Sequence, residues 1–409
     1  MCPVTISETV LPGGQDSGPA APSRRARLLL LALPPLLAFV LAHMVDYVAA
    51  AHIGLSSGFF SPWRWIHRDS HLYLNVAATH YRLFHCHKST IAPHSWCGNA
   101  GWLPLYPELI SLLGKFGASL PWAGKYLAEA FGLGTLVLVW LLIGPSWSAP
   151  SLLALALAAV FPGQIYLFAV FPVSLAAFLS LAFLLLLARG RYVLAGLAGA
   201  AAAWAYPTGF VLAGVAVAYT AIADRGRSLG EWLRRVLPSA GIAALGFALL
   251  LAAYQYWTSA WNAYFLVQAK YGNGLHNPVA IFLSSFAYTH SPVVQYAIQQ
   301  PNIGYHHLAP RYQTVLVAAL VLTLVVAALT VWRSSLTKAD WAVLCYTVLI
   351  WLFPLTQSAA VSRYRSEVLL IPCVALFRRL PVAIQIPVVL AAGWIAFGMA
   401  ELFFRGKLV

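Results

Sequence analysis

Residues 28–51 read LLLLALPPLLAFVLAHMVDYVAAA. This stretch is almost wholly apolar, and as a helix it is long enough to cross about 30 Å of hydrocarbon. It is too long for the core of a signal peptide, and no clear cleavage site follows it. We therefore expect it to remain in the protein as a membrane anchor.

Similar apolar stretches recur along the rest of the chain, at 121–144, 149–162, 172–188, 193–222, 236–257, 313–332, 340–356, 363–377 and 383–404. The turn Tyr206-Pro207-Thr208-Gly209 should divide the stretch 193–222 into two shorter helices, because Pro and Gly break helices. This gives about eleven spans, several of them shorter than the usual ~20 residues. Because backbone polar groups must be satisfied inside a bilayer, the sequence predicts an all-α, polytopic transmembrane helical bundle of about 9–12 spans.

The overall composition supports the same fold class. The 409 residues are 61% hydrophobic and 9% charged, whereas soluble domains have roughly 25% charged residues. A soluble fold is therefore excluded. The formal net charge is +14, and the charges lie mostly between apolar stretches. Membrane topology and phosphate-bearing lipid partners explain this charge better than nucleic acid, which we do not expect as a partner.

The chain is expected to consist of a disordered cytoplasmic tail over 1–26, rich in Pro, Gly and Ser, and a single transmembrane domain over 27–409. Short basic clusters set the orientation of the bundle. These clusters are Arg24, Arg25 and Arg27; Arg189 and Arg191; Arg225, Arg227, Arg234 and Arg235; Arg333 and Lys338; and Arg378 and Arg379. About eleven spans place every cluster on the cytoplasmic side, so the polar loops 51–120 and 258–312 face outward. The Ala- and Leu-rich composition and the short loops favour a bacterial inner membrane.

The first outer loop contains the segment WRWIHRDSHLYLNVA at residues 63–77. Helical spacing relates Asp69, Tyr73 and His80, which predicts a short helix along the membrane surface with these residues on one stripe. A carboxylate just outside the bilayer could act as a general base toward a sugar hydroxyl. Asp69 could instead cap the N-terminus of the helix. The local pattern does not separate these two roles.

The same loop ends in the segment CGNAGWLPLYPE at residues 97–108. The pattern Asp69-x-x-x-Tyr73-x-x-Val76-Ala77, followed by Trp102-Leu103-Pro104-Leu105-Tyr106-Pro107, resembles the first luminal loop of PIG-V-type mannosyltransferases and their bacterial relatives in the GT-C superfamily. Further pieces resemble family positions in the same order: Phe161-Pro162, Phe171-Pro172-Val173-Ser174, the turn at Tyr206 and Ser362-Arg363-Tyr364. Two departures leave the sugar open, because the family often has Trp where this chain has Arg68 and an acidic residue where it has Val173.

The resemblance implies an integral membrane glycosyltransferase that transfers a hexose, with mannose as the expected sugar, on the extracytoplasmic face. Such enzymes transfer a sugar with inversion from a polyprenyl-phosphate donor to a lipid- or glycan-linked acceptor, and the resemblance makes Asp69 the general base. Arg363 and Arg365 are candidates for binding the donor phosphate, because guanidinium groups match its geometry; interfacial snorkelling is the alternative role. His80 is a further candidate for the phosphate. Candidate substrate-binding residues are Tyr73, Trp102, Tyr106 and Tyr364.

Ionisable residues within apolar spans are expensive and often functional. Asp46 is therefore the runner-up base, and Glu129 is a further acidic candidate. Cys86 and Cys97 share an outward-facing polar loop, so they could form a disulfide in an oxidising compartment.

The first outer loop is also rich in histidine, at His67, His71, His80, His85, His87 and His94. No HExxH-type pattern or other strong metal motif accompanies these residues, so we expect no structural metal. A weakly bound divalent cation, Mg²⁺ or Mn²⁺, near a donor phosphate remains compatible with the sequence. The second outer loop holds Trp257, Trp261, Gln268, Lys270, Tyr271, His276, Asn277, His306 and His307. Aromatic and amide groups suit sugars and lipid headgroups, although aromatic residues also crowd membrane interfaces for structural reasons.

A secondary transporter or flippase of a lipid or sugar substrate is the alternative function. A transporter should show intramembrane charges or paired broken helices around a midplane site. In this sequence the polar residues concentrate in the outer loops instead, which favours the enzyme.

Overall fold

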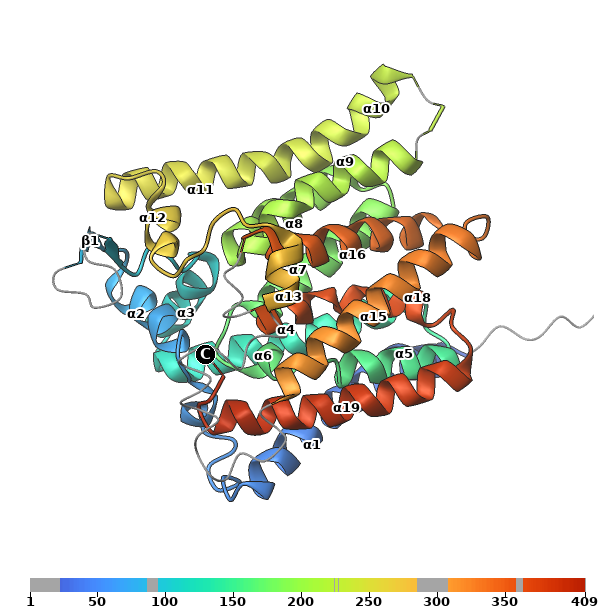
Figure 1. The fold of residues 1–409 in the computed structure, drawn as a ribbon, viewed down its shortest axis with the longest axis horizontal. Helices are drawn as coiled ribbons and strands as arrows, with labels where there is room; N and C mark the ends of the chain where they lie inside the picture. Colours follow the sequence, from blue (N-terminus) through green and yellow to red (C-terminus); the bar gives the residue numbers. More distant parts are fainter. Residues whose placement is uncertain are drawn as a thin grey trace, which may run out of the picture.

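The structure is a computed structural model that describes residues 23–86, 95–223, 225–226, 228–284, 308–357 and 363–408, apart from the side chains of Ser284 and Arg363. Figure 1 shows a bundle of helices of very different lengths, with a small β-hairpin at one end. The first half contains α1 (Arg24–His52), the 3-10 helix η1 (Pro62–Trp65), α2 (Ser70–Thr79), strands β1 (Leu83–His85) and β2 (Trp96–Gly98), α3 (Leu105–Lys115), α4 (Leu120–Ile143), α5 (Ala149–Ala159), α6 (Ile165–Phe168), α7 (Val173–Ala188) and α8 (Tyr192–Ala205).

The second half of the chain continues the helical bundle. It contains the 3-10 helix η2 (Pro207–Val211), α9 (Leu212–Ala223), α10 (Leu229–Val236), the π-helical turn η3 (Leu237–Gly241), α11 (Ile242–Thr258), α12 (Ala263–Ala269), α13 (Pro278–Ser284), α15 (Ala309–Thr330), α16 (Lys338–Gln357), α17 (Arg363–Glu367), the 3-10 helix η6 (Val368–Cys373), α18 (Val374–Phe377) and α19 (Val382–Phe404).

Within the described residues, 6 helices are long and apolar enough to cross a membrane, and four further apolar helices of 10–17 residues lie between them. The protein is therefore a multi-pass integral membrane protein, and the predicted helical bundle is confirmed. Large apolar side chains such as Leu28, Val40 and Met44 of α1 are exposed on the outside of the bundle. Exposed apolar surface of this kind suits contact with lipid. The interior is equally apolar: α7 packs between α4 and α8, and most of its side chains are buried.

Several predicted boundaries were wrong. The first helix begins at Arg24, so it includes residues assigned to the tail; the preceding residues 1–22 lie outside the described part. The helix predicted over 149–162 ends at Ala159, before Phe161-Pro162, because Pro cannot donate the next backbone hydrogen bond. The stretch 363–377 is not one α-helix. It forms α17, η6 and α18, with Pro372 inside the 3-10 segment.

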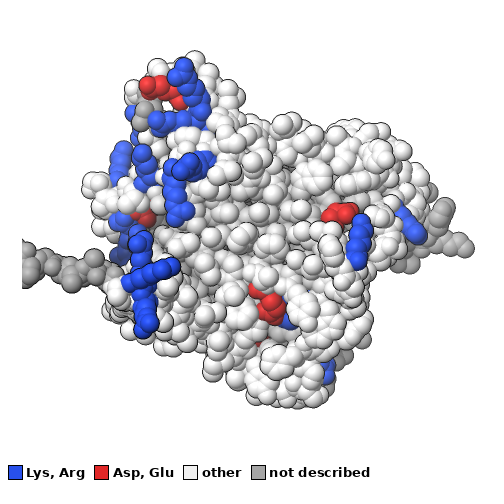
Figure 2. All heavy atoms as spheres, turned by 180° about the vertical axis from the view of Figure 1, so that it is seen from behind, with Lys and Arg blue, Asp and Glu red and all other residues white. Residues whose placement is uncertain are grey.

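The two ends of the bundle differ in charge. Figure 2 shows Lys and Arg side chains gathering toward one end of the molecule. Figure 1 shows that α10 and the turns between α15 and α16 and between α18 and α19 lie at this end, and these segments carry predicted basic clusters. The hairpin and helices α2, α3 and α12 lie at the other end. The described residues of the basic clusters thus share one side of the bundle, and the described parts of the two polar loops meet on the opposite side.

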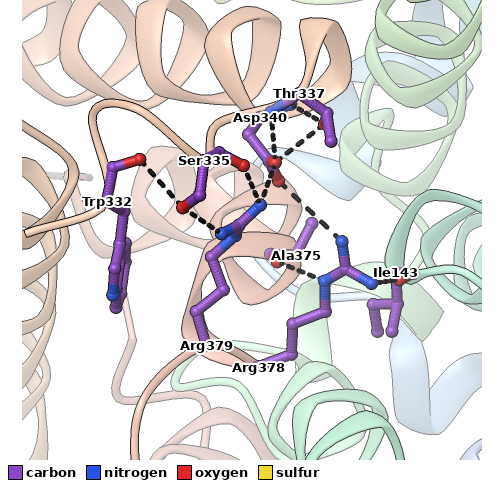
Figure 3. Close-up of polar contacts among 8 residues, drawn as sticks. All are labelled: Ile143, Trp332, Ser335, Thr337, Asp340, Ala375, Arg378 and Arg379. Atoms are coloured by element: carbon purple, nitrogen blue, oxygen red, sulfur yellow. Dashed lines mark hydrogen bonds and ion pairs between the residues drawn. The ribbon is translucent and has the colours of Figure 1, made fainter.

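A polar clasp at the basic end holds three helix termini together (Figure 3). Asp340 is buried and pairs with Arg379 at 2.6 Å and with Arg378 at 4.0 Å. Arg378 also donates to the carbonyl oxygen of Ile143 at the end of α4. Asp340 caps its own helix as well, because its carboxylate accepts from the backbone N–H of Thr337 at 2.9 Å. The clasp therefore fixes the basic end of the segment α17–α18, whose other end carries Arg365.

We expect Asp340→Ala to lower the free energy of unfolding by about 3 kcal/mol, because the substitution leaves two largely buried guanidinium groups without their carboxylate. Thermal unfolding of the purified protein in detergent measures this loss. Lys338→Ala is the matched control, since Lys338 lies in the same turn but is exposed. Equal melting temperatures for the two variants would contradict a stabilising clasp.

Candidate functional site

Asp69 lies in a tight turn just before α2. Arg68 adopts a left-handed backbone conformation with φ 50°, and the backbone N–H of Ser70 donates to the carbonyl of His67 at 3.0 Å. Asp69 occupies the N-cap position of α2, but its side chain accepts no capping hydrogen bond. Its carboxylate instead forms an ion pair with Arg365, which is 296 residues away in sequence. The capping role that the sequence left open is therefore not how this side chain is used.

Arg365 is held in place by aromatic rings. Its side chain is only 6% exposed, whereas that of Asp69 is 34% exposed. The guanidinium carbon lies 5.1 Å from the ring centre of Phe171 and 5.5 Å from that of Tyr166. Gln313 of α15 anchors the same helix by donating to the carbonyl of Tyr364 at 2.8 Å. The aromatic rings hold the Arg365 guanidinium group in place, and this group keeps its positive charge when it is buried.

Asp69 and Arg365 line a cavity of about 520 Å³. Its size is within the range of sites for small molecules and cofactors. The wall combines a few polar groups with many aromatic and apolar ones. The lining residues are Asp69, Tyr73, Gly101, Trp102, Leu103, Phe171, Tyr206, Pro207, Thr208, Phe210, Tyr264, Phe265, Gln268, Ala269, Asn273, Gly274, Phe353, Pro354, Gln357, Arg365 and Ser366.

Four of the predicted site residues thus line one cavity: Asp69, Tyr73, Trp102 and Arg365. Burial raises the pKa of the Tyr73 phenol well above its ordinary value, so the side chain stays a neutral hydrogen-bonding group. Tyr106 lies behind Tyr73, with the ring centres 6.0 Å apart, and its hydroxyl donates to the carbonyl of Gly124 at 2.7 Å. Tyr106 supports the wall and does not line the cavity.

Two further predicted residues, His80 and Tyr364, are not among the described residues that line the cavity. His80 ends α2 with φ 57° and is exposed, and its carbonyl accepts a hydrogen bond from the Asn99 side chain at 2.8 Å. Helical spacing placed it on the stripe of Asp69, but the helix stops one residue before it. Tyr364 is buried, and its ring packs against that of Tyr166 at 5.8 Å. The side chain of Arg363 lies outside the described residues.

The runner-up acids belong to a separate polar cluster inside the bundle. Asp46 of α1 is buried and accepts from Gln164 at 2.6 Å. Glu129 of α4 pairs with His43 at 3.0 Å and with Lys125. The ammonium group of Lys125 lies 3.2 Å from the ring centre of Trp65. Neither acid lines the cavity, and through Lys125 the cluster supports the loop just before Asp69.

A disulfide joins Cys86 and Cys97, the pair considered from the sequence. Cys97 lies in β2 and Cys86 directly follows β1, so the bond closes the end of the antiparallel hairpin. Lys270, in the turn after α12, lies 3.6 Å from the Cys97 sulfur. The hairpin is therefore connected to a segment that lines the cavity.

We expect replacement of both cysteines by serine to lower the free energy of unfolding by about 2–3 kcal/mol, because a disulfide restricts the unfolded chain. Thermal unfolding with and without reductant measures the effect. Reductant should lower the melting temperature of the wild-type protein and leave that of the double variant unchanged. A wild-type melting temperature that ignores reductant would count against a stabilising disulfide.

The described residues contain no group of three or more His, Cys, Asp or Glu side chains placed to hold a metal ion. Two of the loop histidines, His87 and His94, lie outside that part of the chain. Among the described cavity residues, Asp69 is the one carboxylate, and it is paired with Arg365. Because Mg²⁺ and Mn²⁺ prefer several oxygen ligands, these residues do not by themselves build a site for either ion.

Sequence reasoning missed much of the cavity wall. Tyr206 was interpreted as part of a helix break and of a family-like turn but was not named as a site residue, and Phe353 and Pro354 were interpreted only as part of a span. Gln357 is the last residue of α16 and Ser366 lies in α17. Their nearness to the polar stretch 357–363 of the sequence was the available signal. Asn273 lies in the second polar loop, where Gln268 had been noted as a group suited to sugars.

No protein-family model and no curated protein matches the sequence. Among solved structures, the chain is similar to the apo form of an oligosaccharyltransferase from Archaeoglobus fulgidus, with a TM-score of 0.51 and 14% identity over 90% of this chain and 56% of that one. It is also similar to the oligosaccharyltransferase AglB from the same organism, in complex with an inhibitory peptide and a dolichol-phosphate, with a TM-score of 0.50 and 12% identity over 92% of this chain and 56% of that one.

At these identities the similarity concerns the fold. The chain spans little more than half the length of either oligosaccharyltransferase. The narrower resemblance to PIG-V-type mannosyltransferases stays a prediction. What the comparisons and the helices together establish is a multi-pass membrane bundle that shares the fold of these oligosaccharyltransferases.

Proposed function

We propose that the chain is an integral membrane glycosyltransferase that transfers a sugar from a polyprenyl-phosphate donor to a hydroxyl of a lipid- or glycan-linked acceptor. The observation that carries this proposal is the ion pair of Asp69 and Arg365 at the wall of a cavity of about 520 Å³. The fold shared with archaeal oligosaccharyltransferases supports it, since one of them binds a dolichol-phosphate. The resemblance of the first loop makes mannose the leading sugar.

The proposed mechanism uses both members of the ion pair. Before the donor binds, Arg365 neutralises Asp69. The donor phosphate competes for the guanidinium group, which can bind two phosphate oxygens at once. Asp69 is then free to accept a proton. The two charges are therefore coupled, because donor binding prepares the base.

In the transfer step, the oxygen of the acceptor hydroxyl forms a bond to the anomeric carbon of the donor. The Asp69 carboxylate takes the proton of that hydroxyl at the same time. The bond between that carbon and the phosphate oxygen breaks, and its electron pair stays on the polyprenyl phosphate. Arg365 stabilises the charge that develops on this leaving group. Attack from the face opposite the phosphate inverts the anomeric centre, and Asp69 afterwards releases its proton to water.

The proposed orientation places the cavity on the extracytoplasmic side of the membrane, which we take to be a bacterial inner membrane. The basic side of the bundle (Figure 2) would then face the cytoplasm, as the positive-inside rule expects. The cavity residues come from the loops and helix ends of the opposite side. A donor could keep its prenyl tail in lipid while an acceptor approached from water.

The test is to incubate the purified protein with a panel of polyprenyl-phosphate sugars and candidate acceptors and to measure release of polyprenyl phosphate. We expect release that depends on the acceptor and on one sugar of the panel. A protein that releases none, but carries a labelled sugar or lipid into liposomes, would instead be a transporter or flippase.

The polar cluster of Asp46, Glu129, His43 and Lys125 is the observation that favours transport, because intramembrane charges mark many transporter sites. However, Glu129 pairs with His43 and Lys125, Asp46 accepts from Gln164, and Lys125 lies over Trp65. None of these four charged or titratable residues is among the described residues that line the cavity. A bracing role inside the bundle explains them more simply. We therefore keep transport as the second candidate.

A further inference from the structure

Another part of the cavity wall is built from two carboxamide side chains. Gln268, near the end of α12, donates from Nε2 to the carbonyl of Gly101 at 2.6 Å. Its Oε1 accepts from Nδ2 of Asn273 at 2.6 Å. Because Gly101 offers only an acceptor here, the nitrogen of Gln268 must face it, and this choice fixes the orientation of both amides.

The backbone around this amide pair is tied to its surroundings on two sides. The N–H of Gly274 donates to the carbonyl of Gln357 at 3.0 Å, and that of His276 donates to the carbonyl of Thr356 at 2.9 Å. On the Gly101 side there is no free space, since an added Cβ would lie 2.8 Å from a methyl group of Val267 and 3.1 Å from Nε2 of Gln268. The pair is therefore positioned before any ligand arrives.

Asn273 retains hydrogen-bonding capacity that the described part of the chain does not use. One N–H of its amide is directed to Gln268, which leaves the second N–H and the Oδ1 atom without a contact among the described residues. The side chain is half-buried and lines the cavity beside Trp102. It offers one donor and one acceptor next to each other, which matches two neighbouring sugar hydroxyls.

The two amide side chains are themselves uncharged, which favours a sugar over the donor phosphate as their ligand; Lys270, which lies between them in sequence, is directed to the Cys97 sulfur and is not among the described lining residues. The amide pair carries no positive charge, whereas a phosphate is best matched by Arg365. Aromatic side chains, Trp102 and Tyr264 among them, line the same cavity and could cover the apolar faces of a sugar ring.

We propose that Gln268 and Asn273, together with Trp102, form the subsite that binds the sugar of a glycan-linked acceptor. Asn273 contacts two neighbouring hydroxyls of that sugar, and Gln268 holds the Asn273 amide in position. The inference rests on the proposed transfer reaction and specifies its acceptor.

The first test measures, by calorimetry, the binding of methyl glycopyranosides of mannose, glucose and galactose to the purified protein. Asn273→Ala should weaken binding of the preferred glycoside about three- to tenfold, as expected for the loss of neutral hydrogen bonds. Asn277→Ala is the matched control, because Asn277 lies in the same loop but caps α13 and does not line the cavity. Unchanged binding by Asn273→Ala, or no binding by the wild-type protein, would overturn the subsite.

The second test separates this inference from the proposed function. In steady-state transfer, Asn273→Ala should raise the acceptor KM and leave the donor KM unchanged, and Gly101→Ala should do the same by displacing Gln268. An equal rise in both KM values would overturn the assignment to the acceptor. If the wild-type protein transfers no sugar, the proposed function fails, and the glycoside titration still decides whether the subsite exists.

Discussion

Asp69→Asn is expected to abolish sugar transfer, with kcat about 10²–10⁴-fold lower than in the wild-type protein. Asn keeps the shape of the side chain but cannot take the proton of the acceptor hydroxyl. Donor binding should be largely retained, because the substitution leaves Arg365 in place and removes its competitor for the phosphate. Steady-state kinetics with a polyprenyl-phosphate sugar, together with donor titration, measures both effects.

The matched controls for this experiment are Asp46→Asn and Glu129→Gln. Both remove a carboxylate from the same bundle, but neither residue lines the cavity. A thermal unfolding curve for each variant is needed, because Asp69→Asn also leaves the buried Arg365 without its carboxylate. Near-normal turnover by a correctly folded Asp69→Asn protein would transfer the role of base to Asp46 or Glu129, or end the enzyme hypothesis.

The length and recurrence of the apolar stretches were sufficient to predict the bundle, because the cost of unsatisfied backbone groups in lipid leaves few other structures possible. They could not predict where each helix ends. The stretch 363–377 is apolar enough to resemble one span, yet Pro372 and the contacts at both ends divide it. Boundaries of this kind depend on tertiary packing and on single prolines, which an average over a window does not resolve.

The candidate site was predictable only in part, and for a related reason. Asp69 and Tyr73 lie one helical turn apart, so their shared face could be read from local spacing. The same spacing rule wrongly predicted that His80 shares this face, because α2 ends at Thr79. Long-range pairs such as Asp69 with Arg365 carry no local signal at all. Asn273 is a further case, since its amide acquires a defined direction only through Gln268 and the distant Gly101.

Arg365→Gln is expected to raise the donor KM by about 10²-fold and to lower kcat as well, because the guanidinium group both binds the phosphate and stabilises it as a leaving group. Gln can still donate a hydrogen bond but carries no charge. Arg365→Lys should recover only part of the loss, since an ammonium group cannot bind two phosphate oxygens in one plane. Donor titration and steady-state kinetics distinguish the binding effect from the chemical one.

Arg68→Gln is the control that separates these effects from a general loss of positive charge near the site. Arg68 precedes Asp69 in sequence, but it is exposed and donates to the carbonyl of Gly406 at 3.1 Å. Its loss should change the donor KM little, because solvent screens an exposed charge. If both Arg variants weaken donor binding equally, the phosphate is attracted by the charge of the whole loop. If only Arg365→Gln does so, the buried guanidinium is the group that the donor must displace from Asp69.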